Sequence, residues 1–257
     1  MKLYGDYHTH TEYSHGKGSV LDNVQAAAEA GLKEVAIADH GFRHTVFGLS
    51  PKKVKRLTED VKAARELYPG IKIILGVEAN ITGFDGSVDL KPHQWEWFDL
   101  VLAGYHKAAM PYNPRYLFGF HLKNQFNNQF KKKASDKLVT KNTNAVIKLI
   151  EKNPVDILTH INYCFPVLAE EVAKVCAAYG TYLELNSKRI LLSSEETEEV
   201  LRTDAKFIIS SDAHSPDRVG EFSLADKFTE EHNIPHARIV NIGDEPPVFR
   251  SQVSGHR

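Results

Sequence analysis

The sequence is poor in cysteine, in long apolar runs and in net charge, and each shortage excludes a class of protein. Its two cysteines, Cys164 and Cys176, form neither a CxxC pair nor a disulfide framework. Nowhere do 18 apolar residues follow one another, and the first residues lack a basic segment followed by an apolar one. The formal net charge of −1 gives no electrostatic sign of binding to nucleic acid or membrane. We therefore expect a cytoplasmic protein that does not contact a membrane.

Histidine, by contrast, is abundant, with 13 residues in a chain of 257. The first two, His8 and His10, follow an apolar run, and alternate residues of a strand project from the same face. Neutral imidazole is a common ligand of zinc and similar metals, so the pair could form half of a metal site. Two surface histidines of an ordinary loop would have the same spacing, so this motif alone does not decide between the interpretations.

Strand-like apolar runs alternate with helix-like segments along the chain. We predict strands at residues 2–7, 33–38, 71–77, 99–103, 155–158, 182–185 and 207–210, with a possible eighth at 238–242. The predicted helices are 20–31, 51–67, 140–152, 167–179, 194–201 and 222–232. Apolar strands separated by helices imply a parallel sheet covered on both faces, and seven or eight such units predict a closed (β/α) barrel. We expect a single barrel domain over residues 1–245, an insertion at about 107–138 and a loose tail at 246–257.

Residues with metal-binding side chains recur at the ends of the predicted strands, where a barrel of this kind collects its chemistry. They are His8, His10, His15, His40, Glu78, His106, His160, Asp212 and His214. Nine donors are too many for one ion, which takes about four, and carboxylates can bridge two ions. The pattern predicts a cluster of two or three divalent ions, and the many nitrogen donors favour Zn²⁺, Mn²⁺ or Fe²⁺ over Mg²⁺ or Ca²⁺.

Four motifs in a fixed order carry a family resemblance: His8-Thr-His10, Ala38-Asp-His-Gly41, Gly76-Val-Glu-Ala-Asn80, and Ser211-Asp-Ala-His214 followed by Val219-Gly-Glu-Phe222. Through them the sequence resembles the polymerase-and-histidinol-phosphatase (PHP) family over nearly its whole length. The resemblance implies a distorted (β/α)7 barrel with a trinuclear metal centre. It also implies phosphatase or phosphoesterase activity, as in the histidinol-phosphate phosphatases of that family.

The resemblance further implies how the ligands are shared among three ions. One ion would be held by His8, His10, Glu78 and Asp212, a second by Glu78, His106 and His160, and a third by His15, His40 and His214. The chain departs from many relatives at His160-Ile-Asn162, where they have His-Pro-Gly, and at His15, where they carry Asp. Residues 107–138 have no counterpart that we can align.

Several polar residues near the strand ends are candidates for contacts with a substrate. Cations there could neutralise a phosphate, namely Arg43, Lys107, Lys188, Arg189 and Arg218, and we favour Arg43 and Arg189. Asn186 could bind substrate or a metal-bound water, or stabilise a turn. Asp39 could fix the tautomer of a histidine ring or serve as a loop acid. The remaining histidines are expected at the surface: His44, His93, His121, His232, His236 and His256.

We expect a phosphatase of small phosphomonoesters, with L-histidinol phosphate as the named candidate substrate and a metal-bridging hydroxide as the nucleophile. Glu78, Asp212 and His214 are the candidate catalytic residues, the last two as possible aids to proton transfer. The alternatives are a 3′–5′ exonuclease or small-nucleotide phosphodiesterase, a non-catalytic metal-binding module, and an amidohydrolase. The basic run at 131–133 lies near aromatic residues such as Phe126 and Phe130. The neutral net charge nevertheless favours a lid or dimer contact there over nucleic-acid binding. The oligomeric state stays open.

Overall fold

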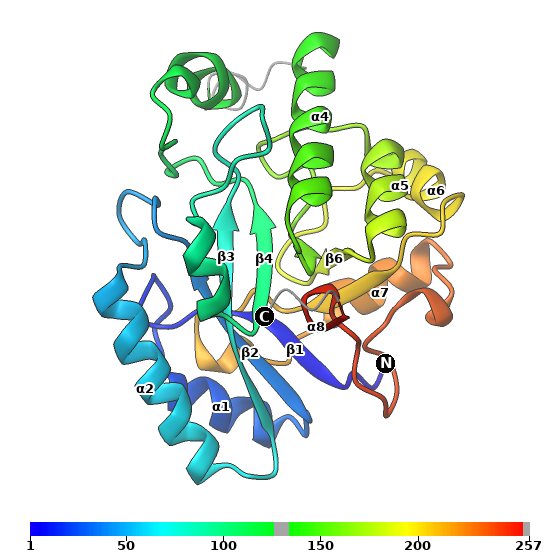
Figure 1. Ribbon diagram of the computed structural model, residues 1–257. Coiled ribbons are helices and arrows are strands. Elements are labelled where there is room, and N and C mark those ends of the chain that lie inside the picture. The colour runs from blue at the N-terminus through cyan, green and yellow to red at the C-terminus, as the bar shows by residue number, and fades with distance from the viewer. Residues whose placement is uncertain (126–133, 254–257) are drawn as a thin grey trace.

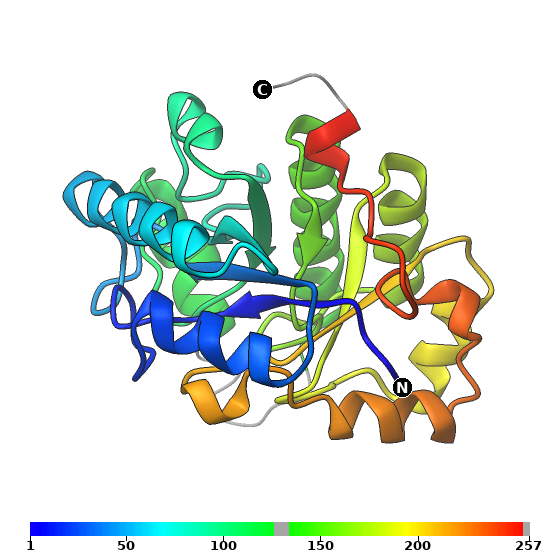
Figure 2. The same cartoon turned by 90° about the horizontal axis from the view of Figure 1, so that it is seen from below.

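Seven parallel strands form a nearly closed barrel in the computed structural model, which describes residues 1–125 and 134–253 (Figures 1 and 2). The strands pair in chain order and are β1 (Gly5–Thr9), β2 (Glu34–His40), β3 (Lys72–Asn80), β4 (Leu100–Gly104), β5 (Ile157–Leu158), β6 (Tyr182–Asn186) and β7 (Phe207–Ser210). The backbone of Ala213, just after β7, accepts from His10, directly after β1, at 2.8 Å and donates to His8 of β1 at 3.3 Å. The predicted α/β barrel and single domain are confirmed, whereas residues 238–242 form isolated bridges at Ile239 and Ile242 and no eighth strand.

Helices surround the barrel and keep the strands apart from solvent (Figure 2). The longer ones are α1 (Val20–Glu29), α2 (Pro51–Leu67), α4 (Asp136–Lys152), α5 (Ala169–Tyr179), α6 (Ser194–Leu201) and α7 (Ser223–Glu231). The short ones are η1 (Pro92–Trp97), η2 (Leu117–Leu122), η3 (Pro216–Arg218), η4 (His236–Arg238) and α8 (Arg250–Val253). Helix α4 begins four residues before the predicted start because the Ser135 side chain accepts from the backbone of Leu138 and caps it. Helix α5 ends at Gly180, whose φ of 73° suits glycine.

The barrel interior is filled by large apolar side chains at the end opposite the strand termini that carry the histidines. Tyr7, Leu100 and Leu102 belong to this cluster, and so does Phe249 from the C-terminal segment. Phe249 is only 1% exposed, and its ring centroid lies 5.2 Å from that of Tyr7. The expectation of a loose tail is therefore wrong for this segment, because the tail turns back and plugs the barrel (Figure 1). Residues 254–257 lie outside the described part of the chain.

Hydrogen bonds between side chains and the backbone also hold the C-terminal segment against the barrel. The Asp156 carboxylate accepts from the backbone of Ser251 at 2.8 Å and from that of Val101 at 2.9 Å. The Tyr182 hydroxyl donates to the carbonyl of Val248 at 2.5 Å. These contacts join β4, β5 and β6 to the segment that follows the last η helix.

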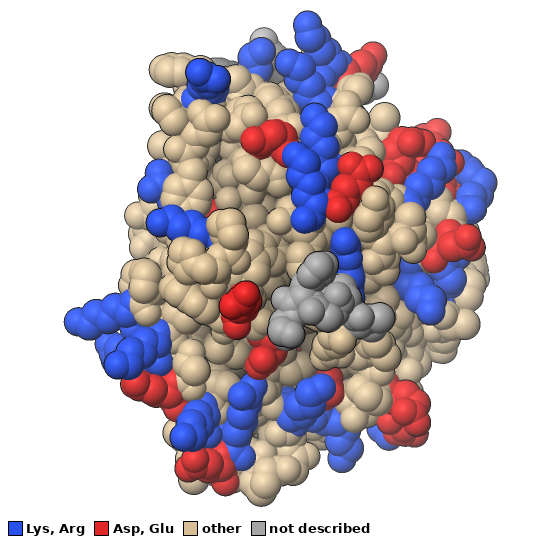
Figure 3. Space-filling view, in the orientation of Figure 1, with Lys and Arg blue, Asp and Glu red and all other residues tan. Residues whose placement is uncertain are grey.

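The predicted insertion is described only in part. Residues 126–133 lie outside the described residues, and with them the basic run at 131–133, Phe126 and Phe130. On the face drawn in Figure 3, cationic and anionic side chains are interspersed and form no continuous basic surface. Among the described residues, no helix combines the length and the apolar character that a membrane span requires.

Candidate metal centre

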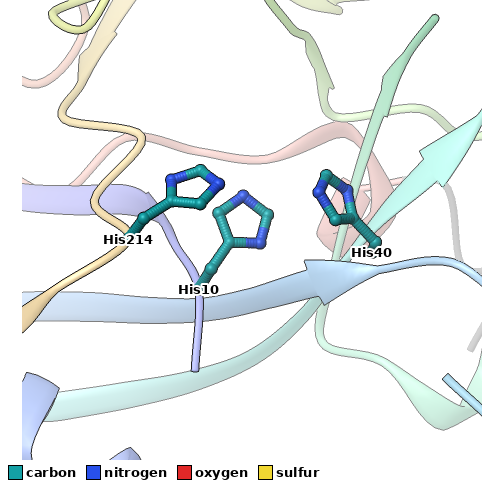
Figure 4. A group of neighbouring side chains, drawn as sticks. All are labelled: His10, His40 and His214. Atoms are coloured by element: carbon teal, nitrogen blue, oxygen red, sulfur yellow. The ribbon is translucent and has the colours of Figure 1, made fainter. Parts of the chain in front are cut away.

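The carboxyl ends of the strands bring the nine predicted ligands to one end of the barrel. His8 and His10 come from β1 and its end, His40 from β2, and Glu78 from β3, where it pairs in register with His40. The others follow their strands: His15 in the loop after β1, and His106, His160, Asp212 and His214 after later strands. In Figure 4 the rings of His10, His40 and His214 gather in one space although three different segments carry them. Parallel pairing explains the meeting, since it places all the strand ends at one rim.

The donor atoms of His8, His10 and Glu78 form a cage of the size that one metal ion needs, and Asp212 adjoins both histidines. His8 Nε2 lies 3.1 Å from His10 Nε2 and 3.4 Å from Glu78 Oε2. Asp212 Oδ1 lies 3.4 Å from His10 Nε2 and 3.9 Å from His8 Nε2. A tetrahedral ion with bonds of about 2.0–2.2 Å separates its ligand atoms by about 3.4 Å. The donor set and its spacing therefore fit a zinc-like ion.

Glu78 is shared between this cage and a second group of donors. Its Oε1 lies 2.9 Å from His160 Nε2 and 3.3 Å from His106 Nε2, while its Oε2 lies 2.9 Å from His40 Nδ1. Neither Glu78 Oε2 nor His40 Nδ1 has a hydrogen-bond partner among the described residues, although both are buried. Buried polar atoms normally have partners, so two that face each other without one suit a bridging position between ions.

Both carboxylates of the centre are anionic at neutral pH. Burial opposes ionisation of Glu78, but the adjacent rings of His106 and His8 outweigh it and hold the pKa of this carboxyl well below its usual range. Burial likewise opposes ionisation of Asp212, and His8 and His10 reverse the effect, so its pKa also falls well below the ordinary value. Two buried carboxylates that stay anionic among imidazole rings form a strong site for cations.

The remaining histidines adjoin this centre. The structure groups them differently from the three ligand sets that the family resemblance implies. His10, His40 and His214 form one group, and His40, Glu78 and His106 form another. His15 lies beside the first group, with its ring centroid 4.0 Å from that of His214 and 4.8 Å from that of His40. Its Nδ1 is buried without a partner in the described part of the chain, so His15 has a nitrogen to offer.

Glu184 is a functional candidate that the sequence analysis missed. Its Oε1 accepts from His8 Nδ1 at 2.7 Å, and its Oε2 accepts from the backbone of His160 at 2.9 Å. A proton held on Nδ1 leaves Nε2 of His8 free to bind a metal. The available signal was a single acid in the apolar strand β6, two residues before Asn186 and therefore on the same face.

Replacing Glu184 with glutamine should weaken metal binding by about 10- to 100-fold, the range measured for such supporting residues. The amide cannot accept from His8 and from the backbone of His160 as the carboxylate does. Competition with a chromogenic chelator measures the change in affinity, and Glu198→Gln, on helix α6, serves as the matched control. Equal metal affinity in E184Q and the parent protein would show that Glu184 does not orient His8.

A similar chain of contacts supports His106. Its Nδ1 lies 2.8 Å from Asn80 Oδ1. The amide of Asn80 donates to Asp89 Oδ2 at 2.5 Å, and its backbone donates to Asp89 Oδ1 at 2.7 Å. Asp89 fixes which way the amide points, so the amide oxygen faces His106 and the ring presents Nε2 to Glu78.

Among the described residues, Asp39 makes no hydrogen bond with a histidine ring, which corrects the interpretation that it fixes the tautomer of one. Its carboxylate accepts from the backbone and the hydroxyl of Thr11 at 2.8 and 2.6 Å, and also from the Ser14 hydroxyl. The same hydroxyl lies 3.5 Å from His10 Nδ1. Asp39 thus holds the loop after β1 in place and reaches His10 only through Ser14.

Asn186 is also occupied within the protein. Its amide donates to Glu184 at 2.9 Å and to Asp212 Oδ2 at 3.2 Å, and its oxygen accepts from the backbone of Lys188 and Arg189. It is 1% exposed. The structure therefore gives Asn186 a role in orienting the two acids, and it offers no free group to a substrate.

The five predicted cations differ in their distance from the centre. Lys188 Nζ lies 2.9 Å from His214 Nδ1 and 3.6 Å from Asp212 Oδ2. Arg189 stacks over Tyr163 at 4.2 Å, and that ring lies 5.3 Å from the ring of His160. Lys188 is therefore the cation in direct contact with predicted ligands.

The other three cations lie farther out. Arg43 stacks over Tyr112 at 5.0 Å. Arg218 forms an ion pair with Glu221 at 2.8 Å on an exposed surface. Lys107 follows His106, and its side chain is exposed.

His44, expected at the surface, instead adjoins the centre. Its ring stacks on that of His40 at a centroid distance of 5.0 Å with an interplanar angle of 9°. Burial and the adjacent His40 lower its pKa to about 4, so its ring is neutral at physiological pH. The sequence held no signal for this contact because the loop after β2 has no regular period.

Comparisons with known proteins agree with the geometry. The family model described as "PHP domain" matches residues 6–188. A protein of Shewanella sediminis named "probable phosphatase" is 28% identical over 275 residues, covering 100% of this chain and 97% of the relative. A protein of Clostridium botulinum, also described as a probable phosphatase, is 29% identical over 259 residues, covering 94% of this chain and 91% of the relative.

Among solved structures, the histidinol phosphate phosphatase of Lactococcus lactis subsp. lactis is similar in fold. The two superpose with a TM-score of 0.60 at 17% identity, covering 91% of this chain and 95% of the other. That enzyme was crystallised with zinc, L-histidinol and phosphate. The family model matches well over half of the chain, over residues that include the first three motifs and the ligands up to His160, and the chain therefore belongs to the PHP domain family.

Proposed function

We propose that this protein is a metal-dependent phosphatase of small phosphomonoesters. The observation that carries the proposal is the cage of His8, His10 and Glu78, which Asp212 adjoins at 3.4 Å from His10 and 3.9 Å from His8. Glu78 also extends to a second group of donors. Two full-length relatives are named phosphatases, and the similar Lactococcus enzyme binds phosphate and zinc. L-histidinol phosphate is the substrate that this likeness suggests for a first assay.

The proposal assigns the donors to two or three ions of Zn²⁺, Mn²⁺ or Fe²⁺. One set is His8, His10, Glu78 and Asp212, a second is Glu78, His106 and His160, and a third is His15, His40 and His214. When bound, such ions supply an activated water at neutral pH and neutralise charge on the phosphoryl oxygens. In this assignment the three candidate catalytic residues, Glu78, Asp212 and His214, act first as ligands.

Around the ions, the residues of the chain would orient ligands and bind the substrate. Glu184 and Asn80 keep the protons of His8 and His106 on Nδ1, so that both rings present Nε2 to the centre. His214 Nδ1 lies 2.8 Å from the carbonyl of Asp212. If Nδ1 carries the proton for that bond, it no longer accepts from Lys188, and the ammonium group beside Asp212 can donate to a phosphate oxygen as well.

Replacing Lys188 with methionine should lower kcat/KM for a phosphomonoester by about 10- to 100-fold, the value of a hydrogen bond to a charged group. Methionine keeps the length and apolar stem of the side chain but removes the charge. Steady-state kinetics with p-nitrophenyl phosphate measure the effect, and Lys227→Met on helix α7 is the control. A K188M variant with the parent's kcat/KM would exclude Lys188 from phosphate binding.

The proposed function is tested on purified protein without a histidine tag. The protein is stripped with chelator, reloaded with Zn²⁺ or Mn²⁺, and assayed with L-histidinol phosphate, nucleotides and p-nitrophenyl phosphate. Elemental analysis should give two or three equivalents of metal, and turnover should return with the metal. Bound metal without hydrolysis of any ester would refute the phosphatase, and degradation of single-stranded DNA in its place would indicate the exonuclease.

A further inference from the structure

His44 occupies a position over the metal centre that the ligand assignment leaves unused. Its half-buried ring is parallel to His40 and lies 6.3 Å from the ring of His106. On another side it stacks on Phe47 at 5.3 Å, and Phe47 in turn stacks on His15 at 4.7 Å. The ring is therefore held by ligands on one side and by an aromatic side chain on the other.

The backbone fixes the protonation pattern of this ring. The N–H of Phe47 donates to His44 Nδ1 at 3.1 Å, so Nδ1 carries no proton and the neutral ring carries it on Nε2. A ligand nitrogen must be free of protons, and the one unprotonated nitrogen of His44 is already an acceptor. His44 is therefore unsuited to bind a metal and is a hydrogen-bond donor instead.

The loop that carries His44 is tied down on both sides. The backbone of Met110 donates to the carbonyl of Arg43, and that of Thr45 donates to the carbonyl of Ala108, both at 2.9 Å. Gly48 closes the turn by donating to the carbonyl of His44 at 3.0 Å, and a Cβ at Gly48 would lie 2.7 Å from that oxygen. The segment after β2 is thus joined to the segment after β4, and the position of the donor is set before any substrate arrives.

We propose that His44 donates a hydrogen bond from Nε2–H to an oxygen of the substrate's phosphoryl group, in the position next to His40 and His106. In the part of the chain that the structure describes, no group accepts from this N–H. A preset donor beside a cationic centre suits an anionic oxygen, because a bond to a charged acceptor is stronger than one between neutral groups. The inference rests on the proposed function, since it takes the phosphoryl group as the ligand.

The test compares three variants in the metal-loaded protein with inorganic phosphate as the probe. His44→Phe keeps the stacking on His40 and Phe47 but lacks the donor, His44→Gln restores an N–H, and His93→Phe is the control. His93 is an exposed residue of η1, which precedes β4 and lies away from the end that carries His106. Calorimetry gives the Kd of phosphate, and elemental analysis gives the metal content.

We expect H44F to bind phosphate about 10- to 100-fold more weakly with the parent's metal content. H44Q should recover part of the affinity, and H93F should match the parent. Unchanged phosphate affinity in H44F would overturn the inference, and so would loss of metal from H44F, since His44 would then support the metal site itself. If the parent protein binds phosphate but hydrolyses no ester, the proposed phosphatase activity is refuted. The phosphate titrations would still decide whether His44 binds the phosphoryl group.

Discussion

Replacing Glu78 with glutamine should lower kcat/KM for a phosphomonoester by at least about 1000-fold, equivalent to about 4 kcal/mol of transition-state stabilisation. Glu78 is fully buried, and its two oxygens face histidines of both donor groups. An amide has one oxygen and a donor nitrogen, so it cannot bridge two ions and would direct N–H groups toward the centre. The variant should therefore lose metal as well as activity.

Two measurements check this prediction together: kcat/KM after metal reloading, and metal equivalents by elemental analysis. The matched control is Glu96→Gln, an exposed residue of η1 that should behave as the parent protein does. Glu78→Asp tests whether the position of the carboxylate matters, since aspartate keeps the negative charge on a side chain that is one methylene shorter. Full metal content with less than a tenfold loss of activity in E78Q would contradict a bridging role.

Replacing Phe249 with alanine should destabilise the protein by about 3–5 kcal/mol, as expected for a buried aromatic side chain. Phe249 fills the barrel interior against Tyr7 and Tyr182, at centroid distances of 5.2 and 6.1 Å. Loss of the Phe249 ring leaves a cavity, and the rigid strands around it cannot move inward to fill it. For a chain of this size the melting temperature should fall by about 10 °C.

Urea denaturation and a thermal melt at constant metal concentration measure the effect. The neighbouring Val248→Ala is the control, since Val248 is 61% exposed and should change stability by less than about 0.5 kcal/mol. The two variants alter adjacent residues of the same segment. A difference in stability between them therefore reports the burial of Phe249 and not merely a substitution in this segment. Equal stability of F249A and V248A would mean that the C-terminal segment does not close the barrel in solution.

The metal centre shows how far a single sequence can predict a site. Their spacing on a strand predicts His8 and His10 as ligands, and its place at a strand end predicts Glu78; the structure brings the three side chains together. The residues that orient these ligands leave a weaker signal in the sequence. Glu184 accepts from His8, which is distant in the chain, and Asp89 acts on His106 only through Asn80, so neither contact follows from local spacing.

The sequence by itself determined the alternation of strands and helices and the kinds of donor at the strand ends. Both are local properties, because periodicity and capping act over a few residues. Only the tertiary structure decided that His44 stacks on His40, that Asp39 holds a loop rather than a ring, and that Phe249 plugs the barrel. These contacts join irregular segments to distant partners, and closure of the barrel brings them together without any repeating pattern in the chain.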